Sequence, residues 1–348
     1  MMVRRIALCA VQLPFTWGGA EIHVESLQRE LLARGYDVDV IRLPFKWYPK
    51  PEILKGCLAW RLLDLTEADG RPIDLVIATK FPSYVVRHPN KVTWLIHQLR
   101  DVYDLFDTPF SEFTNTEEDL RLREIIRRID TATLSESQRI FANSRNTAAR
   151  LARFNRVNAE PLYHPPQHDG RYRCDGYGNF VLAVSRVTKL KRIDLLVEAM
   201  AYARTPVQAL VVGEGQELEN LVRLAERRGI DDRIRFLGFV DDEQLIELYA
   251  RCLCVFYTPY DEDFGYVTLE AFRSHKPVLT ARDSGGPLEF VSHGITGMIS
   301  DPSRPEQFAA CIDELYVDRA RAEALGGAGF ESIAWISWSR VVDKLVGD

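Results

Sequence analysis

Apolar residues in the first half of the chain fall into short uninterrupted runs that alternate with longer segments of helical period. The runs predict strands at residues 6–11, 36–43, 75–78, 92–97 and 139–143. The amphipathic segments predict helices at residues 21–34, 116–130 and 144–154. Strands that alternate with helices indicate a parallel sheet covered on both faces, so the fold class is α/β.

The alternation stops over residues 160–179, EPLYHPPQHDGRYRCDGYGN, which are rich in Pro, Gly and Tyr and have no period. It then restarts, with strands predicted at residues 180–184, 209–212, 234–237, 254–257 and 277–280. Helices are predicted from residues 192 and 216, after the loop at 260–265, and at residues 242–251, 305–316 and 319–326. The chain therefore divides into a domain at 1–165, a linker at 166–178, a domain at 179–330 and a final helical segment at 331–348.

Two doubly wound, Rossmann-like domains in tandem are an architecture in their own right. Ligands of such sheets bind outside the carboxyl ends of the strands, so a cleft between the two halves is the expected site.

Composition excludes several classes of protein. The formal net charge is −6 over 348 residues, which argues against a general nucleic-acid binder. Residues 171–348 carry 21 Lys and Arg against 28 Asp and Glu, so an anionic ligand there needs local cations. The six cysteines have neither zinc spacing nor a disulfide framework, and no apolar run has the length of a membrane span. We expect a cytoplasmic protein.

Two cations stand at a strand-to-helix turn in this acidic half, in VSRVTKLKRIDLLVEA. Arg186 and Lys191 follow the first strand of the second domain, where a parallel sheet places its ligands. A planar guanidinium and a compact ammonium suit a diphosphate, although a solvated basic turn has the same composition.

Three further loops are candidates. Gly213 lies in VVGEGQE, where a glycine pair permits either close approach of a ligand or a tight turn. Gly18 and Gly19 lie in FTWGGAE and offer the same two interpretations. His97 ends a predicted strand in WLIHQLRDVYD, where it either faces a cleft or caps a turn.

The stretch YDEDFGYVTLEAF, residues 260–272, combines a loop crowded with acids and the start of a helix. Carboxylates accept hydrogen bonds only, and Glu262 and Glu270 suit the vicinal hydroxyls of a sugar or a ribose. Amides at the helix start favour an anion. A sugar nucleotide reconciles the two, with its diphosphate on Arg186, Lys191 and the amides.

These motifs resemble the retaining glycosyltransferases of family 4, which have the GT-B fold. The pair Glu262 and Glu270 matches that family's E-x7-E motif, within EDFGYVTLEAFRSHKPV and DSGGPLEFVSHGITG. Arg186 and Lys191 fall at the family's Arg and Lys positions. The likeness extends over nearly the whole chain, through GGAE, ANSRNTAARL, YHPP and SWSRVVDKL.

The resemblance implies a role for each candidate. Glu262 would contact the transferred hexose and Glu270 the ribose, while Arg186 and Lys191 would stabilise the departing diphosphate. The further donor-binding residues are Gly18, Gly19, Gly213, Phe264, Gly265, Tyr266 and Val267. His97 would touch the sugar from the first domain, and the last helix would cross back to that domain.

The implied reaction moves a hexose from a UDP- or GDP-sugar to a glycan or lipid-linked acceptor, with no cofactor and no metal. The product would belong to a cell-surface polysaccharide or glycolipid. Ser185, Tyr266 and the pair Ser274-His275 depart from the family pattern and leave the donor sugar open. The alternatives are a metal site at Asp261-x-Asp263, a glycoside hydrolase, and a non-catalytic sugar-nucleotide-binding regulatory subunit.

One segment bears on the membrane. SRNTAARLARFNR holds Arg145, Arg150, Arg153 and Arg156 without an acid, so its helix is either a basic face for anionic lipid or a solvated surface. Peripheral contact with the inner membrane face is the accompanying hypothesis.

Overall fold

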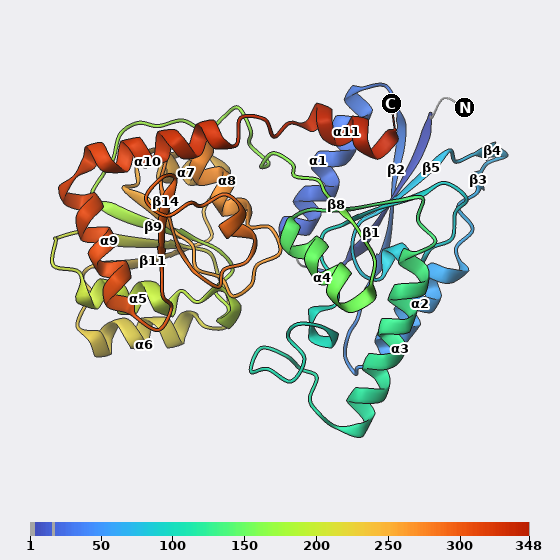
Figure 1. Cartoon of the computed structure of the whole chain (residues 1–348), viewed down its shortest axis with the longest axis horizontal. Helices are drawn as coiled ribbons and strands as arrows, with labels where there is room; N and C mark the ends of the chain where they lie inside the picture. Colours follow the sequence, from blue (N-terminus) through green and yellow to red (C-terminus); the bar gives the residue numbers. More distant parts are fainter. Residues whose placement is uncertain (1–3, 16–17, 348) are drawn as a thin grey trace. The chain divides into compact units, whose positions relative to one another are not determined.

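Two six-stranded parallel sheets organise the chain, each with helices against it (Figure 1). The computed structural model describes residues 4–15 and 18–347. Its contacts divide the chain into one unit of Met1–Gln167 with Ile336–Asp348 and a second of His168–Trp335. Residues 168–178, expected to be a linker, group with the second unit, where Asp175 and Gly178 donate backbone hydrogen bonds to Ala250 and Arg251.

The first sheet has the strand order β2-β1-β5-β6-β7-β8. Its strands are β1 (Arg5–Gln12), β2 (Asp37–Pro44), β5 (Leu75–Ala78), β6 (Lys91–Leu95), β7 (Arg139–Ala142) and β8 (Glu160–Pro161). Its helices are α1 (Gly19–Ala33), α2 (Glu52–Leu62), α3 (Glu117–Leu134), α4 (Arg145–Asn155) and α11 (Trp338–Val346). A small hairpin of β3 (Glu67–Ala68) and β4 (Arg71–Pro72) and the 3-10 turns Ser83–Val85 and Arg100–Val102 complete this unit.

Alternate residues of the first sheet enter two separate cores. Ala7 and Cys9 pack with residues of α2, α3 and α4, whereas Ile6 and Leu8 pack with residues of α1 and α11. Period-two alternation places successive side chains on opposite faces, so a strand buried on both sides must be apolar throughout. The buried run of β1 follows from this arrangement.

The second sheet has the order β11-β10-β9-β12-β13-β14. Its strands are β9 (Phe180–Val184), β10 (Gln208–Val212), β11 (Ile234–Gly238), β12 (Cys254–Phe256), β13 (Val278–Ala281) and β14 (Gly297–Ser300). Its helices are α5 (Asp194–Tyr202), α6 (Leu218–Arg228), α7 (Asp242–Arg251), α8 (Tyr266–Arg273), α9 (Pro305–Val317) and α10 (Arg319–Ser332). Two 3-10 turns cover Lys189–Lys191 and Gly286–Glu289.

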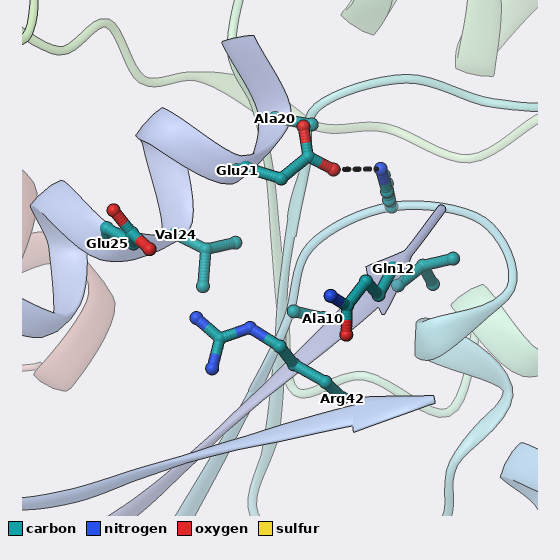
Figure 2. Close-up of a pocket in the computed structure, with 9 residues that line it drawn as sticks. Ala10, Gln12, Ala20, Glu21, Val24, Glu25 and Arg42 are labelled. Atoms are coloured by element: carbon teal, nitrogen blue, oxygen red, sulfur yellow. Dashed lines mark hydrogen bonds and ion pairs between the residues drawn. The ribbon is translucent and has the colours of Figure 1, made fainter. Parts of the chain in front are cut away.

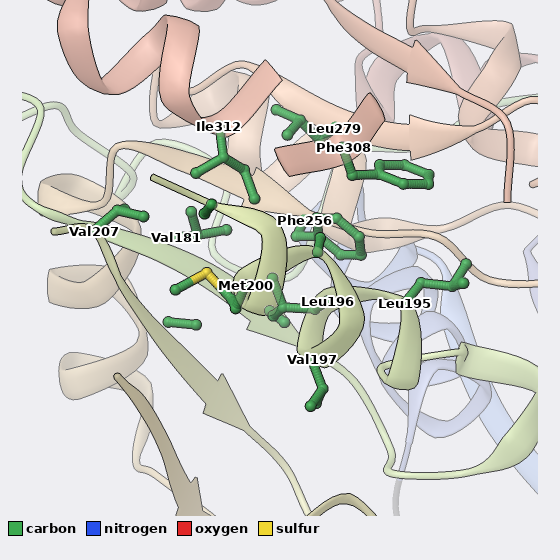
Figure 3. Packing of buried hydrophobic residues seen from close by; sticks show 14 of the residues in the cluster. Val181, Leu195, Leu196, Val197, Met200, Val207, Phe256, Leu279, Phe308 and Ile312 are labelled. Carbon is green, nitrogen blue, oxygen red and sulfur yellow. The ribbon is translucent and has the colours of Figure 1, made fainter. Parts of the chain in front are cut away.

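One core of the second unit lies between the sheet and helices α5, α6, α9 and α10 (Figure 3). Leu196 and Met200 of α5 and Phe308 of α9 are fully buried there. On the opposite side of β12 and β13 lies α8, which follows the acidic loop. Both faces are therefore covered, and the ligand-binding surface of this unit is left to the loops at the strand ends.

The predicted α/β fold class is confirmed. The sequence analysis did not predict α2, β14, or the short strands β3, β4 and β8. Helix starts follow local chemistry: Thr116, Ser144, Asp241 and Ser337 each cap a helix by accepting a hydrogen bond from the amide three residues later. Within the described parts of the chain, every helix is too short or too polar to cross a membrane.

Candidate active site

The loops after β9, β12 and β13 are fastened to one another at the carboxyl edge of the second sheet. Arg192, in the left-handed conformation at φ 49°, pairs with Asp283 at 2.6 Å and donates to the carbonyls of Thr258 and Pro259. The amides of Asp261 and Glu262 donate to Asp283 and Ser284. This bonding fixes the backbone from which the predicted cations and acids project.

A cation and an acid predicted from the sequence meet here. The Lys191 ammonium forms an ion pair with the Glu262 carboxylate and lies 3.4 Å from the hydroxyl of Tyr257. Both charged side chains are mostly shielded, with 16% and 22% exposed. A pair shielded to this degree interacts more strongly than one in open solvent. The two residues, predicted to bind different parts of one ligand, are thus in contact within the second unit.

The Tyr257 side chain lies at the centre of this charge cluster. It is 5% exposed, and burial together with the nearby carboxylates of Glu262 and Glu270 raises the pKa of its hydroxyl well above the ordinary value. The positive charge of Arg186 acts on the same hydroxyl in the opposite direction. Lys191 and Glu262 thus adjoin this neutral phenol, and the charges of Glu270 and Arg186 act on it as well.

Arg186 extends from the loop directly after β9 and is exposed, unlike Lys191. Its loop is held by two backbone bonds, from Ser185 to Val212 at 3.1 Å and from Val187 to Glu214 at 2.8 Å. An exposed guanidinium on a fixed loop can meet a ligand without breaking a core contact. It supplies the fork of donors that a phosphate group needs.

Glu270 lies on α8 and accepts a hydrogen bond of 2.6 Å from the hydroxyl of Tyr249, a fully buried residue of α7. Burial raises the pKa of Glu270 to about 6, and the hydrogen bond from Tyr249 opposes that rise. The ring of Tyr172 packs edge-on against Tyr249, at 5.9 Å between centroids. The carboxylate is oriented by its surroundings and is costly to ionise, a combination common at functional sites.

Two candidate glycines of the second unit, Gly213 and Gly265, are also required for steric reasons. A Cβ on Gly213 would lie 1.9 Å from the carbonyl of Ser185, because the loops after β9 and β10 touch at this point. Gly265 has φ 86°, and a Cβ there would lie 2.9 Å from the Tyr257 ring. Glycine is therefore required at both positions by the packing that shapes the site.

Gly265 also stands immediately before α8, whose first residues are Tyr266 and Val267. The preceding Phe264 is buried and packs against Phe290 at 6.0 Å between ring centroids. The first amides of a helix lack acceptors within that helix and point outward from its N-terminus. These amides follow Glu262 of the acidic loop closely in the chain.

The remaining predicted residues lie in the first unit. Gly18 precedes α1, Gly19 is its first residue, and the adjacent Thr16 and Trp17 of FTWGGAE lie outside the described residues. His97 follows β6, is half-buried, and its Nδ1 lies 2.7 Å from the carbonyl of Gln98. All three are thus placed at the carboxyl ends of the first sheet's central strands or beside them.

Three aromatic residues of the second unit, Tyr257, Tyr249 and Phe239, were not singled out from the sequence. In the sequence, Tyr257 and Tyr249 occupy ordinary apolar positions of a strand end and a helix. Only the tertiary structure shows that their hydroxyls lie beside Lys191 and Glu270. Phe239 follows β11 directly and is 80% exposed. An exposed aromatic ring after a parallel strand is available for stacking, and its position after a strand was the available signal.

The basic segment is only partly available as a surface. Arg150 of α4 is 5% exposed and pairs with Asp104 at 3.0 Å, so it is committed to the interior. Arg145, Arg153 and Arg156 are exposed. The expected four-arginine face is therefore reduced to three residues, because the apolar side of the helix carries Arg150 into the core.

The acidic loop does not form a metal-binding group within the described part of the chain. Among the residues that the structure describes, no three His, Cys, Asp or Glu side chains are arranged to hold a metal ion. Asp261 and Asp263 flank Glu262 in a loop whose backbone is paired with the loop after β13.

The two parallel, doubly wound sheets match the GT-B fold of solved glycosyltransferase structures. The chain superposes on sucrose-phosphate synthase from Thermosynechococcus elongatus with a TM-score of 0.76 at 22% identity, covering 98% of this chain and 97% of that one. It superposes on Anabaena Alr3699/HepE, whose structure is a complex with UDP-glucose, with a TM-score of 0.71 at 19% identity over 98% of each chain.

Residues 169–331, nearly the whole second unit, match the model of the family Glycosyl transferases group 1. The chain is also 35% identical over 190 residues to the GDP-mannose-dependent alpha-(1-6)-phosphatidylinositol monomannoside mannosyltransferase of Mycobacterium tuberculosis, covering 50% of this chain and 48% of that protein. It spans about half or less of the length of such curated relatives. The resemblance to glycosyltransferases inferred from the motifs is confirmed.

Proposed function

We propose that the protein is a retaining hexosyltransferase of family 4 that uses a UDP- or GDP-sugar. The observation that carries the proposal is the charge cluster around Tyr257, in which Lys191 and Glu262 are in direct contact. A glycoside carries no diphosphate, so a hydrolase would have no use for two cations beside its acids. A nucleoside diphosphate sugar uses all four charged groups.

The diphosphate is assigned to Arg186, Lys191 and the amides at the start of α8. In binding there, its negative charge competes with Glu262 for the Lys191 ammonium, which leaves the Glu262 carboxylate to accept from hydroxyls of the hexose. Glu270, already oriented by Tyr249, accepts from the ribose hydroxyls. The exposed ring of Phe239 is a surface on which the base can stack.

The proposed transfer occurs on one face of the sugar. The bond between the anomeric carbon and the phosphate oxygen breaks, the acceptor oxygen bonds to the same carbon from the same side, and its proton passes to the departing phosphate. Negative charge grows on the diphosphate as that bond breaks, so cations placed there bind the transition state more tightly than the substrate. One such group contributes about 2.7–4 kcal/mol, or roughly 10²–10³ in rate.

Gly18, Gly19 and His97 are assigned to the donor as well: the glycines would contact the phosphate and sugar, and His97 the sugar. Gly213 permits close approach of the loop after β10. The acceptor is a glycan or lipid-linked molecule, which fits the phosphatidylinositol monomannoside named for the mycobacterial relative. Arg145, Arg153 and Arg156 would support contact with an anionic membrane face. The assigned cations replace a metal, so chelation should leave activity unchanged.

Thermal melting with UDP, GDP and ADP tests the donor site. A nucleotide at 100 times its dissociation constant stabilises by about 2.7 kcal/mol, a shift of several degrees. Glu270→Ala should abolish the shift, and an unchanged shift would remove Glu270 from the ribose. The anomeric proton coupling of the product, read by NMR, then tests retention: inversion would overturn the proposed mechanism, and hydrolysis of a simple glycoside would favour the hydrolase.

A further inference from the structure

A small cavity lies in the first unit at the carboxyl ends of β1 and β5, beside the start of α1 (Figure 2). Its volume is about 40 Å³, which accommodates a group the size of a hydroxyl or hydroxymethyl rather than a whole sugar ring. Val24 and Ala10 form part of an apolar wall of the cavity, and Gln12 adds a polar side chain to its lining (Figure 2). The cavity therefore suits one polar edge of a larger ligand.

Opposite charges are built into the wall of this cavity. The Lys80 ammonium lies 3.3 Å from the Glu21 carboxylate, and the two side chains are 8% and 17% exposed. Lys80 is held in place by its backbone, since its amide and that of Thr79 both donate to the hydroxyl of Ser83. A buried ammonium on a fixed loop is expensive to desolvate, and the distance to Glu21 leaves room for further hydrogen bonds.

Two more charged residues, Glu25 and Arg42, line the same cavity. With Glu21 and Lys80 they make two acids and two bases, so the formal charge of the wall is zero. A phosphate placed here would gain two cations but face two carboxylates. A hydroxyl group donates to a carboxylate and accepts from an ammonium at the same time, which satisfies both members of the pair.

We propose that this cavity is an acceptor subsite that selects an uncharged polyhydroxylated edge and discriminates against a phosphorylated one. The inference rests on the proposed glycosyl transfer and narrows its acceptor class. Glu21 accepts a hydrogen bond from the acceptor hydroxyl and Lys80 donates one to it. The apolar wall at Val24 excludes larger substituents. A phosphate on a remote part of the acceptor is compatible with the proposal, whereas a phosphate in the cavity is not.

Titration followed by NMR saturation transfer tests the selection, with methyl α-D-mannopyranoside and myo-inositol as neutral probes. Mannose 6-phosphate and myo-inositol 1-phosphate are the charged counterparts. At least one neutral probe should bind about tenfold more tightly than its counterpart. Glu21→Gln should weaken that binding about tenfold, while Glu30→Gln, on the same helix and paired instead with Arg34, should not. If Glu21→Gln does not fold, Gln12→Leu is the second variant, and it should likewise weaken binding of the neutral probe.

Three outcomes would overturn the subsite: tighter binding of a phosphorylated probe, equal effects of Glu21→Gln and Glu30→Gln, or binding of no probe. A nucleotide melting shift measured on the same samples separates the two levels of inference. A normal shift without polyol binding rejects the subsite alone, whereas loss of the nucleotide shift in the wild-type protein rejects the proposed function.

Discussion

Replacing Glu270 with glutamine should stabilise the protein and weaken nucleotide binding at the same time. The wild-type carboxylate has a pKa of about 6 because it is buried, against 4.5 for the same group in water. This difference corresponds to about 2 kcal/mol of stability lost once the group is ionised. The glutamine oxygen can still accept from Tyr249, so the variant keeps that hydrogen bond without the buried charge.

The effect has a defined pH dependence. Between pH 4.5 and about 6 the folded wild-type protein binds more protons than the unfolded chain, so its stability falls as the pH rises through this window. The advantage of Glu270→Gln should therefore be about 2 kcal/mol at pH 7.5 and below about 1 kcal/mol at pH 5. In melting temperature, the gain at pH 7.5 is roughly 4–8 °C.

The same substitution should weaken nucleotide binding although it raises stability. A neutral amide is a weaker acceptor for ribose hydroxyls than a carboxylate, so affinity for the nucleoside diphosphate should fall about tenfold. Calorimetric unfolding and isothermal titration of the same preparations measure both quantities. Glu226→Gln, an exposed position on α6, is the control and should change neither. A Glu270→Gln protein that is no more stable at pH 7.5, or whose advantage is equal at pH 5, would refute the reasoning.

Further outcomes follow from the packing. Gly265→Ala should destabilise by about 1–3 kcal/mol in thermal melts, because of its positive φ and its contact with an aromatic ring, whereas Gly327→Ala, with open space on α10, should not destabilise; equal melting points would contradict this account of the turn. His164 has a pKa of about 4 because it is buried, so below pH 6.5 this residue binds more protons in the unfolded chain; its contribution should lower stability by about 2 kcal/mol from pH 7 to pH 5, read by urea unfolding as the difference between the wild-type protein and His164→Gln. A matching loss in His164→Gln would assign the dependence elsewhere. Arg150→Ala should cost about 3–5 kcal/mol, and Arg153→Ala less than about 0.5, in the same urea assay; similar costs would place Arg150 on the surface.

Much of the fold was predictable because fully buried parallel strands have no polar side to interrupt their apolar runs. The runs of β9 and β5 are of this kind, and they were located within a residue or less. β14 has the sequence GMIS, too short and too mixed to stand out, and α2 follows a proline-rich stretch that resembles a loop. These elements are set by tertiary packing rather than by local pattern.

The positions of the candidate residues in the fold were predictable where they follow a predicted strand or begin a predicted helix. Arg186 and Lys191 flank one turn, and Glu262 and Glu270 flank the start of one helix, so the sequence alone placed both pairs at strand ends. The contact between Lys191 and Glu262 joins residues 71 positions apart, and no local pattern encodes it. The burial of Arg150 likewise depends on Asp104. Sequence identified the charges, and only the fold identified their partners.

The cluster around Tyr257 is proposed to bind the diphosphate of a nucleotide sugar. Isothermal titration of UDP and GDP into Lys191→Met and Lys189→Met tests it most directly, because the two lysines share one 3-10 turn and only Lys191 contacts Glu262. We expect at least about tenfold weaker binding for Lys191→Met and wild-type binding for Lys189→Met. Equal affinities for the two variants, with the wild-type protein binding a nucleotide, would contradict it.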